Sequence, residues 1–217
     1  MAETVALIDY GSGNLRSAEK ALVHAAQTAG LKRRILVTDN PDQVAAADRV
    51  VLPGVGAFAD CYQGLAAIDG LIDVLHGVRD ADRPLLGICV GMQLLAREGF
   101  EHGRHKGFGW IDAVVGPLKT DDPALKIPHM GWNTLAMTQA GAIHPMLKGI
   151  QAGDHAYFVH SYHMACQSHG LCLAHTDYGG PVVAMVANRA VVGTQFHPEK
   201  SQQLGQKILT NFLQWQP

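Results

Sequence analysis

Residues 84–93 constrain the fold most, because an apolar run there ends in Gly-x-Cys-x-Gly, formed by Gly87, Cys89 and Gly91. This pattern predicts a nucleophile elbow, a sharp turn between a strand and a helix with the reactive side chain at its tip. Glycines on both sides of Cys89 let other backbone pass close by, and we expect the helix to run from Gly91 to Arg97. Unpaired N–H groups and the dipole of a helix N-terminus favour a thiolate. Taken alone, the motif also fits a buried cysteine in a core strand.

Strand-like and helix-like segments alternate in the first half of the chain. Apolar runs predict strands, and segments of helical periodicity predict helices; the strands are expected at 4–9, 34–38, 49–53 and 85–88, and the helices at 15–29, 60–67 and 70–79. This alternation predicts an α/β fold with a mostly parallel central sheet and flanking helices. Ligands of such sheets bind beyond the carboxyl ends of the strands. We therefore expect the turns after Asp9, after Pro53 and at Cys89 to share one edge.

The pattern changes after residue 107. Short apolar runs separated by Gly, Pro, Asn and Asp predict a β-rich and partly antiparallel C-terminal half, with strands at 110–115, 156–159, 171–175, 182–186 and 191–196. Ser201 is expected to cap a final helix that ends near Gln214. With 217 residues, 47% of them hydrophobic, and without a linker, the chain is expected to form a single domain over residues 1–217.

Composition excludes several classes of protein. The formal net charge is −2 and there is no run of Lys or Arg, which disfavours nucleic acid as a partner. No apolar run approaches the length of a membrane span, and the first residues, with an early acid and no basic segment, do not resemble a signal peptide. The four cysteines are irregularly spaced, as expected of reduced thiols in a cytoplasmic protein rather than of a disulfide framework.

A second motif near the C-terminus supplies partners for a thiol nucleophile. His197-Pro198-Glu199 follows a predicted strand, and its proline stiffens the turn, so that the imidazole and the carboxylate can project in the same direction. We assign His197 as general base and acid and Glu199 as the residue that orients it. Taken alone, the motif also fits an exposed histidine with a glutamate in a first helical turn. Its combination with the cysteine elbow favours catalysis.

The oxyanion of a tetrahedral intermediate needs N–H donors. We expect one from the backbone of Val90, directly after the nucleophile. The second is expected from residues 53–56, Pro-Gly-Val-Gly, whose glycines permit the backbone to turn an N–H inward. An ordinary turn at the end of a strand is an equally good interpretation of this segment alone.

Together the two motifs resemble those of the class I (triad) glutamine amidotransferases. The matching segments are 87–93 (GICVGMQ) and 195–201 (QFHPEKS), and further matches at 9–15, 52–58, 128–133 and 157–162 resemble one branch of that family. The resemblance covers nearly the whole chain and implies a flavodoxin-like three-layer fold. It implies a glutaminase in which Cys89 attacks the side-chain amide of glutamine and His197 protonates the departing ammonia. Val90 stands where leucine is usual, which should not matter because only its N–H acts.

The resemblance also implies roles for other residues. It assigns glutamine binding to Gln93 and to backbone near Gly56, Ser161 and Tyr162. It implies a separate cyclase subunit of (β/α)₈ fold, which receives ammonia through a channel and faces Tyr10, Asn14, Met130, Trp132 and Lys200. Without the resemblance, each of these five residues reads as an ordinary turn, core or solvated residue. In the family the Gly54–Val55 peptide is thought to flip, so that the Val55 N–H completes the oxyanion hole when the cyclase binds its substrate.

Other signals are weak. The glycines at 11–13 resemble a dinucleotide-binding loop, but Arg16 stands where its third glycine would be. His102 and His105 have no further ligands at suitable spacing, and Cys166 and Cys172 fit a core strand as well as a metal site. We therefore expect neither a metal nor a cofactor.

Three alternative functions remain open from the sequence. The chain could be an amidotransferase serving another synthase or a free-standing glutaminase, against which segments 10–14 and 128–133 argue. It could be a cysteine peptidase or γ-glutamyl hydrolase with the same triad chemistry on a larger substrate. A non-enzymatic scaffold is a third reading, against which the complete set of Cys89, His197 and Glu199 argues.

Overall fold

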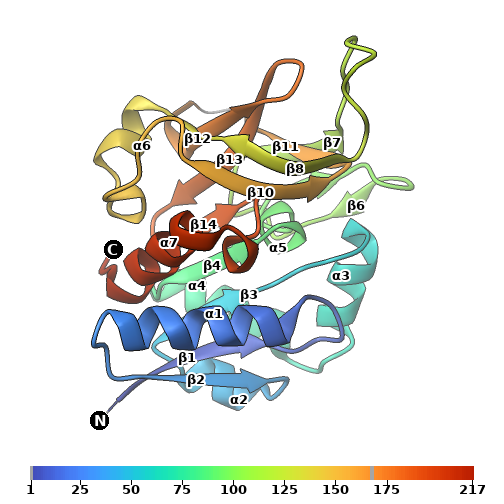
Figure 1. Cartoon of the computed structure of the whole chain (residues 1–217). Helices are drawn as coiled ribbons and strands as arrows, with labels where there is room; N and C mark the ends of the chain where they lie inside the picture. Colours follow the sequence, from blue (N-terminus) through green and yellow to red (C-terminus); the bar gives the residue numbers. More distant parts are fainter. Residues whose placement is uncertain (1, 167–168) are drawn as a thin grey trace.

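The computed structural model describes residues 2–166 and 169–217, and within them the central element is an eight-stranded sheet (Figure 1). Five neighbouring strands run parallel: β2 (Arg33–Thr38), β1 (Glu3–Ile8), β3 (Arg49–Leu52), β4 (Leu85–Ile88) and β14 (Val191–Thr194). Beyond β14 the sheet continues antiparallel through β13 (Pro181–Asn188), β12 (Cys172–Asp177) and β9 (Ala136–Met137). The mostly parallel α/β sheet predicted from the alternation of strands and helices is thus confirmed.

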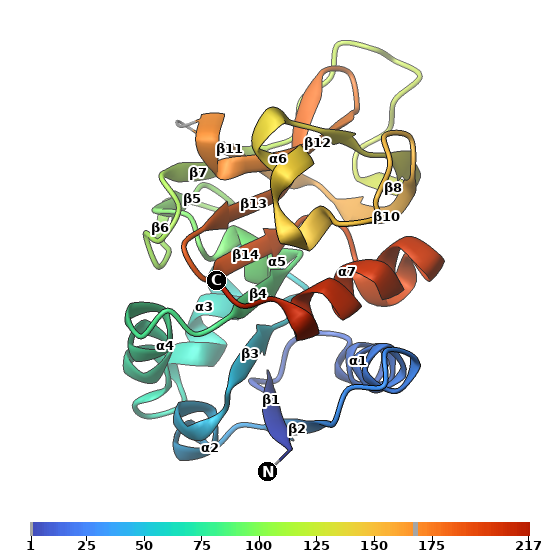
Figure 2. The same cartoon turned by 90° about the vertical axis from the view of Figure 1, so that its left-hand side faces the viewer.

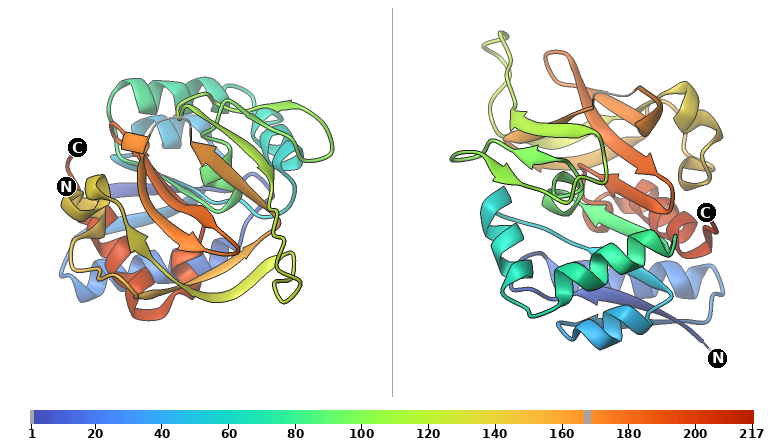
Figure 3. Two further views of the ribbon diagram at one scale, coloured as in Figure 1. Left: turned by 90° about the horizontal axis from the view of Figure 1, so that it is seen from above. Right: turned by 180° about the vertical axis from the view of Figure 1, so that it is seen from behind.

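Helices cover both faces of the parallel part. In Figure 2, α1 (Leu15–Thr28) and α7 (Gln202–Gln214) lie on one side of the strands. On the other side lie α2 (Pro41–Ala46), α3 (Phe58–Ala66) and α4 (Leu71–Asp80). The right-hand view of Figure 3, in which the molecule is seen from behind, shows these three helices in front of the sheet. The strands between them are apolar runs because both faces are buried: every residue of β3 and of β4 is buried. None of the described helices is long and apolar enough to cross a lipid bilayer.

The β-rich half adds two small sheets above the central one (Figure 1). In the first, β8 (His129–Thr134) pairs antiparallel with β10 (His155–His160). The second has the order β11 (Tyr162–Cys166), β7 (Ala113–Pro117), β5 (Glu98–Gly99) and β6 (His105–Lys106). Short helical segments lie in the connections: α6 (Gln139–Ile143) and the 3₁₀ turn η1 (Pro145–Leu147) between β9 and β10, η2 (His169–Leu171) between β11 and β12, and η3 (Pro198–Lys200) between β14 and α7.

The helix after the cysteine is shorter than predicted. The sequence suggested a helix from Gly91 to Arg97, whereas α5 spans only Val90–Gln93. The carbonyls that would continue it are taken by an incoming segment, because Leu94 O accepts from the Phe108 N–H at 2.8 Å and Leu95 O accepts from the Trp110 N–H at 2.9 Å. The same bonds hold residue 110 out of the strand predicted at 110–115, so that β7 begins only at residue 113.

Candidate active site

Cys89 stands at the tip of a strained turn between β4 and α5. Its backbone has φ 54°, a region that side chains other than glycine rarely adopt and that is typical of a nucleophile elbow. A Cβ on Gly91 would come within 2.0 Å of Leu52 O, and one on Gly87 within 2.6 Å of Gly91 O. Both glycines are therefore required by close backbone approach, as the Gly-x-Cys-x-Gly pattern predicted.

Neighbouring strands bring the second motif to the cysteine. β4 and β14 are parallel neighbours with Ile88 paired to Thr194, and the Cys89 N–H donates to Thr194 O at 2.7 Å. The residues that follow Thr194 therefore emerge beside Cys89. Within them, His197 Nδ1 lies 2.8 Å from Glu199 Oε1, and both side chains are almost completely buried. An ionised carboxylate only accepts hydrogen bonds, so Nδ1 carries the hydrogen and Nε2 is the atom that can exchange a proton with the thiol.

The electrostatics of the site favour a charged imidazole. Burial by itself lowers the pKa of His197, but the neighbouring Cys89 sulfur and the Glu199 carboxylate outweigh it and raise the pKa to about 9. His197 Nε2 is buried and has no hydrogen-bond partner among the described residues. This nitrogen is consequently available to exchange a proton with the Cys89 thiol or with a leaving group.

Ser201 holds the loop that carries His197. The sequence suggested that its side chain caps the last helix, but Ser201 makes no such bond at the start of α7. Its hydroxyl instead donates to His197 O at 2.6 Å and accepts from the Tyr157 N–H at 2.9 Å. A third bond, from the His197 N–H to Tyr157 O at 2.9 Å, fastens the loop to β10. Tertiary partners have therefore replaced the expected cap.

A cavity of about 290 Å³ opens over the thiol. The residues with predicted roles that line it are Cys89, His197, Val55, Val90, Gly56, Gln93, Ser161, Tyr162 and Lys200. Glu101, Pro128, Val159 and His160 also line it. The structure thus gathers in one pocket the nucleophile, its base and every residue for which glutamine binding was predicted.

Gln93 is held in one orientation at the wall of this cavity. Its Nε2 donates to Tyr162 O and to Gln195 Oε1, each at 3.0 Å. Both amide hydrogens are then in use, which leaves Oε1 as an acceptor for a ligand. Gln195, which is completely buried, also has its Nε2 3.7 Å from the Cys89 sulfur. Gln195 therefore connects the nucleophile to the side chain that orients a ligand.

Both expected oxyanion donors are engaged elsewhere in this structure. The Val90 N–H donates to Gly54 O at 3.3 Å. The Val55 N–H donates to Ser12 Oγ at 3.1 Å, so it points to the loop after β1 rather than to the cavity. The Gly54–Val55 peptide thus presents its carbonyl, not its N–H, to the elbow.

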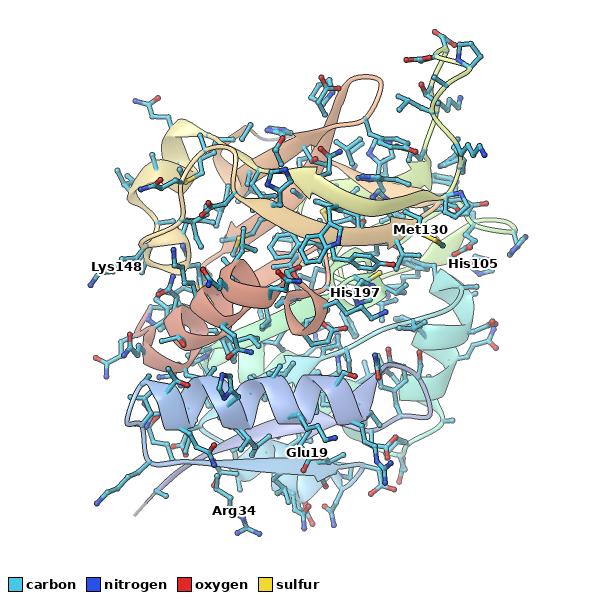
Figure 4. The ribbon with its side chains drawn as sticks, in the orientation of Figure 1. Glu19, Arg34, His105, Met130, Lys148 and His197 are labelled. Carbon is cyan, nitrogen blue, oxygen red and sulfur yellow. The ribbon has the colours of Figure 1, made fainter. Side chains whose placement is uncertain are left out.

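The residues expected to face a partner differ in exposure. Met130 and Trp132 on β8 are 62% and 47% exposed, and Lys200 is exposed with its Nζ over the Tyr157 ring. Figure 4 labels Met130 and His197, which lie in the same part of the view, well away from Arg34 and Lys148. Asn14 is half-buried, whereas Tyr10 is buried because its hydroxyl donates to Pro53 O at 2.6 Å. Tyr10 supports the loop that carries Val55.

Among the residues at the site to which sequence reasoning gave no role, four form hydrogen bonds through their side chains: Gln195, His160, Ser12 and Glu101. Gln195, His160 and Ser12 lie within matching motifs, so a signal was present. The contact of Ser12 depends on the approach of two loops. Glu101 lines the cavity and accepts from the Phe58 N–H at 2.8 Å; it belongs to a segment in which the sequence shows no motif.

Comparison with known proteins decides which family this site belongs to. A sequence model described as Glutamine amidotransferase class-I matches residues 6–215. Imidazole glycerol phosphate synthase subunit HisH of Rhodospirillum rubrum is 57% identical over 98% of this chain and 99% of its own. The protein of the same name from Rhodopseudomonas palustris is 54% identical over 99% and 100%. The chain belongs to the class-I glutamine amidotransferases, in the branch of the imidazole glycerol phosphate synthase subunits HisH.

Solved structures of glutaminases and amidotransferases share the fold. The glutaminase domain of Trypanosoma brucei CTPS aligns with a TM-score of 0.67 at 16% identity, over 97% of this chain and 91% of that one. A crystal structure described as a glutamine amidotransferase aligns with a TM-score of 0.70 at 17% identity, over 97% of each chain. At such identities the likeness concerns the arrangement of the backbone.

Proposed function

We propose that this class-I amidotransferase, acting as one domain over residues 1–217, hydrolyses glutamine to glutamate and ammonia. The observation that carries the proposal is the pairing of the elbow cysteine with a buried, protonated His197 held by Glu199. An imidazolium beside the cysteine is the form of the base that can give a proton to the leaving group. The cavity over Cys89 supplies room for one small substrate.

The reaction follows from these positions. Cys89 Sγ bonds to the amide carbon, and the carbonyl oxygen becomes an oxyanion. His197 Nε2 gives its proton to the amide nitrogen, the C–N bond breaks, and ammonia leaves a γ-glutamyl thioester. Water then attacks the thioester, His197 takes a proton from it, and glutamate departs. Gln93 Oε1 and the Glu101 carboxylate are the acceptors at the pocket for the α-ammonium group of glutamine.

The oxyanion hole requires a change in the Gly54–Val55 peptide. We propose that this peptide turns over, so that the Val55 N–H points to the cavity and the Val90 N–H is released from Gly54 O. Two observations support this: both N–H groups are bound to other acceptors, and Gly56, on one side of Val55, has φ 109°. In the present orientation Ser12 Oγ accepts from the Val55 N–H and donates to Val55 O, so this hydroxyl holds the segment as it is.

We further propose that a cyclase subunit of (β/α)₈ fold is the partner that favours the second orientation. The names of the relatives as subunits of a synthase and the exposed side chains of Met130 and Trp132 on β8 support a docked subunit. Ammonia would pass directly to it and react with its ribulosyl aminoimidazole substrate, PRFAR, giving imidazole glycerol phosphate and AICAR. We propose a cytoplasmic location for the complex.

Glutamate release tests the function. The purified chain is assayed with glutamine alone, with the cyclase subunit, and with the cyclase plus PRFAR, with Cys89→Ala as the control. We expect strong stimulation only in the complete mixture and no activity in the variant. High activity of the isolated chain that ignores the cyclase would contradict the synthase role, and activity on γ-glutamyl peptides would favour a hydrolase of larger substrates.

A further inference from the structure

Two histidines that the proposed chemistry does not use are buried beside the pocket. His129 begins β8 and is 2% exposed, and His160 ends β10 and is 6% exposed. The two residues are opposite each other in the antiparallel pair, and His129 Nδ1 lies 3.0 Å from His160 Nε2. The two rings therefore form one hydrogen-bonded unit, and His160 is part of the pocket wall.

Neighbouring groups determine which ring nitrogens carry hydrogen. His160 Nδ1 lies 3.0 Å from Tyr162 O, and a carbonyl oxygen only accepts, so Nδ1 is the donor. His160 Nε2 must then accept from His129 Nδ1, and His129 Nε2 accepts from Asn133 Nδ2 at 3.3 Å. The chain of donors runs in one direction from Asn133 through His129 and His160 to the Tyr162 carbonyl.

The surroundings keep this chain neutral and rigid. Burial lowers the pKa of His129 to about 4, and burial together with the positive charge of His129, His163 and His197 lowers the pKa of His160 to about 3. The His129 ring is stacked on Phe158 and on Tyr178, with centroids 4.8 and 3.9 Å apart. The stacked rings leave the His129 imidazole no room to turn over. The lowered pKa values keep both imidazoles neutral near pH 7.

The chain joins a surface to the ligand pocket. Its last acceptor, Tyr162 O, is also the acceptor that orients Gln93. Its first members lie on β8, where exposure alternates: His129 is buried and Asn133 half-buried, while Met130 and Trp132 are exposed. A partner that contacts Met130 and Trp132 thus contacts the same strand that carries His129.

We propose that His129 is a positioning residue that transmits the position of β8, through His160 and the Tyr162 carbonyl, to Gln93 and the glutamine pocket. The proposal rests on the proposed glutaminase function. It assigns to His129 an effect mainly on the binding of glutamine, because the chain leads first to Gln93, the side chain that orients a ligand, and reaches Cys89 only through the further contacts of Gln195.

Two polar substitutions of similar size separate this role from a merely structural one. In His129→Asn the amide nitrogen stands near the place of Nδ1 and can still donate to His160. In His129→Gln the amide reaches the place of Nε2 instead, and His160 Nε2 loses its donor. Leaving a buried acceptor unpaired corresponds to a change of about tenfold. We therefore expect His129→Gln to raise KM for glutamine about tenfold with little change in kcat, and His129→Asn to stay near the wild type.

The assay uses the full chain with PRFAR and the cyclase subunit, and His163→Gln is the matched control. His163 is a half-buried histidine next to Tyr162, and its Nδ1 has no hydrogen-bond partner in the described part of the chain. As a second measurement, Cys89 is labelled with a diazoketone analogue of glutamine and with iodoacetamide. We expect His129→Gln to slow only the labelling by the analogue.

The outcomes distinguish the two proposals. Equal KM values for the Asn and Gln variants, or equal slowing of both labels, would overturn the role of His129 while leaving the glutaminase function intact. A wild-type chain that releases no glutamate in any mixture would instead overturn the proposed function itself.

Discussion

The reactive groups depend on bonds that fix single atoms. Glu199 holds the hydrogen of His197 on Nδ1 and so leaves Nε2 for the thiol. Gln195 connects the Cys89 sulfur to Gln93, and Gln93 has its amide oxygen left for a ligand. These bonds hold each side chain in one orientation, and such preorganisation lowers the cost of arranging groups during a reaction.

The titration of His197 tests this arrangement. Its pKa is raised from 6.5 to about 9, so folding favours the imidazolium. The corresponding stabilisation is complete below about pH 6.5 and is lost as the pH rises through about 9. NMR of the labelled imidazole should give a midpoint near 9, and Glu199→Gln should lower it because the carboxylate charge is removed. Glu101→Gln is the control and should leave it in place; an unshifted midpoint in Glu199→Gln would contradict the assignment.

Whether a residue's role was predictable depended on how local its pattern is. Cys89, His197 and Glu199 each belong to a short motif whose spacing implies chemistry, so the sequence was sufficient to single them out as candidates. Gln195 acquires its contacts only from the register of β14 beside β4, which no local pattern specifies. Tyr10 stays a predicted partner residue, and the bond of its hydroxyl to Pro53 O is a contact between loops 43 residues apart that no local pattern specifies.

At the level of elements, the site is made by close approach of backbones. The elbow packs against the end of β3 so tightly that Gly91 has no room for a side chain.

The predicted strands and long helices were largely right, because their apolar periodicity reflects burial in the core. The helix after Cys89 was predicted too long, because residues 94–96 are buried on all sides and their carbonyls pair with residues 108–111. Helix α2 was not predicted, although Asn40 before Pro41 caps it through its side chain.

A pair of glycine substitutions tests the packing of the elbow. In Gly91→Ala the new Cβ would meet Leu52 O at 2.0 Å, so we expect a loss of about 3 kcal/mol or more in the free energy of unfolding. Gly77→Ala is the matched control in α4, where a Cβ meets nothing within 4 Å. It should stabilise the protein by about 0.5–1 kcal/mol, because alanine is the better helix former. Urea unfolding measures the free energy of unfolding of both variants. Equal changes in the two would contradict the close packing of Gly91 against Leu52 O.

The loop after β1 is expected to restrain the oxyanion segment. Ser12→Ala removes the acceptor of the Val55 N–H and should raise the basal glutaminase activity about fivefold, the equivalent of one hydrogen bond of about 1 kcal/mol. Ser17→Ala in α1 serves as the control. Gly54 is the poorer position to alter, because any Cβ there meets Gly91 N at 2.5 Å. A lower basal activity in Ser12→Ala would show that the hydroxyl supports the productive orientation instead.

On the scale of the whole molecule, the parallel strands direct the catalytic loops to one side, and the β-rich half adds β8 and β10 there (Figure 1). The sequence indicated the parallel part clearly, whereas the pairing of the short later strands depends on contacts across many residues. β8 presents Met130 and Trp132 on its outer face, and on its inner face His129 contacts His160 of β10, which lines the cavity. The proposed partner surface is therefore connected to the cavity through the pair of β8 and β10.

This surface predicts where a partner binds. Trp132→Glu places a charge on an exposed aromatic site and should weaken binding of the cyclase subunit about tenfold or more, as loss of an aromatic anchor does. Its unfolding midpoint should remain that of the wild type. Ile143→Glu is the matched control, since Ile143 on α6 is 86% exposed. Calorimetric titration with the cyclase measures both, and a larger effect of Ile143→Glu would place the interface elsewhere.

The most direct measurement of the central claim is the fate of the glutamine amide nitrogen. The complete complex receives PRFAR, amide-¹⁵N-glutamine and an equal concentration of unlabelled ammonium, and the imidazole product is analysed by mass spectrometry. If ammonia released at Cys89 passes directly to the cyclase, almost every product molecule carries one ¹⁵N atom. With Cys89→Ala in place of the wild type, the product is unlabelled. A wild-type product whose label matches the mixed ammonia pool of the solution would contradict the account.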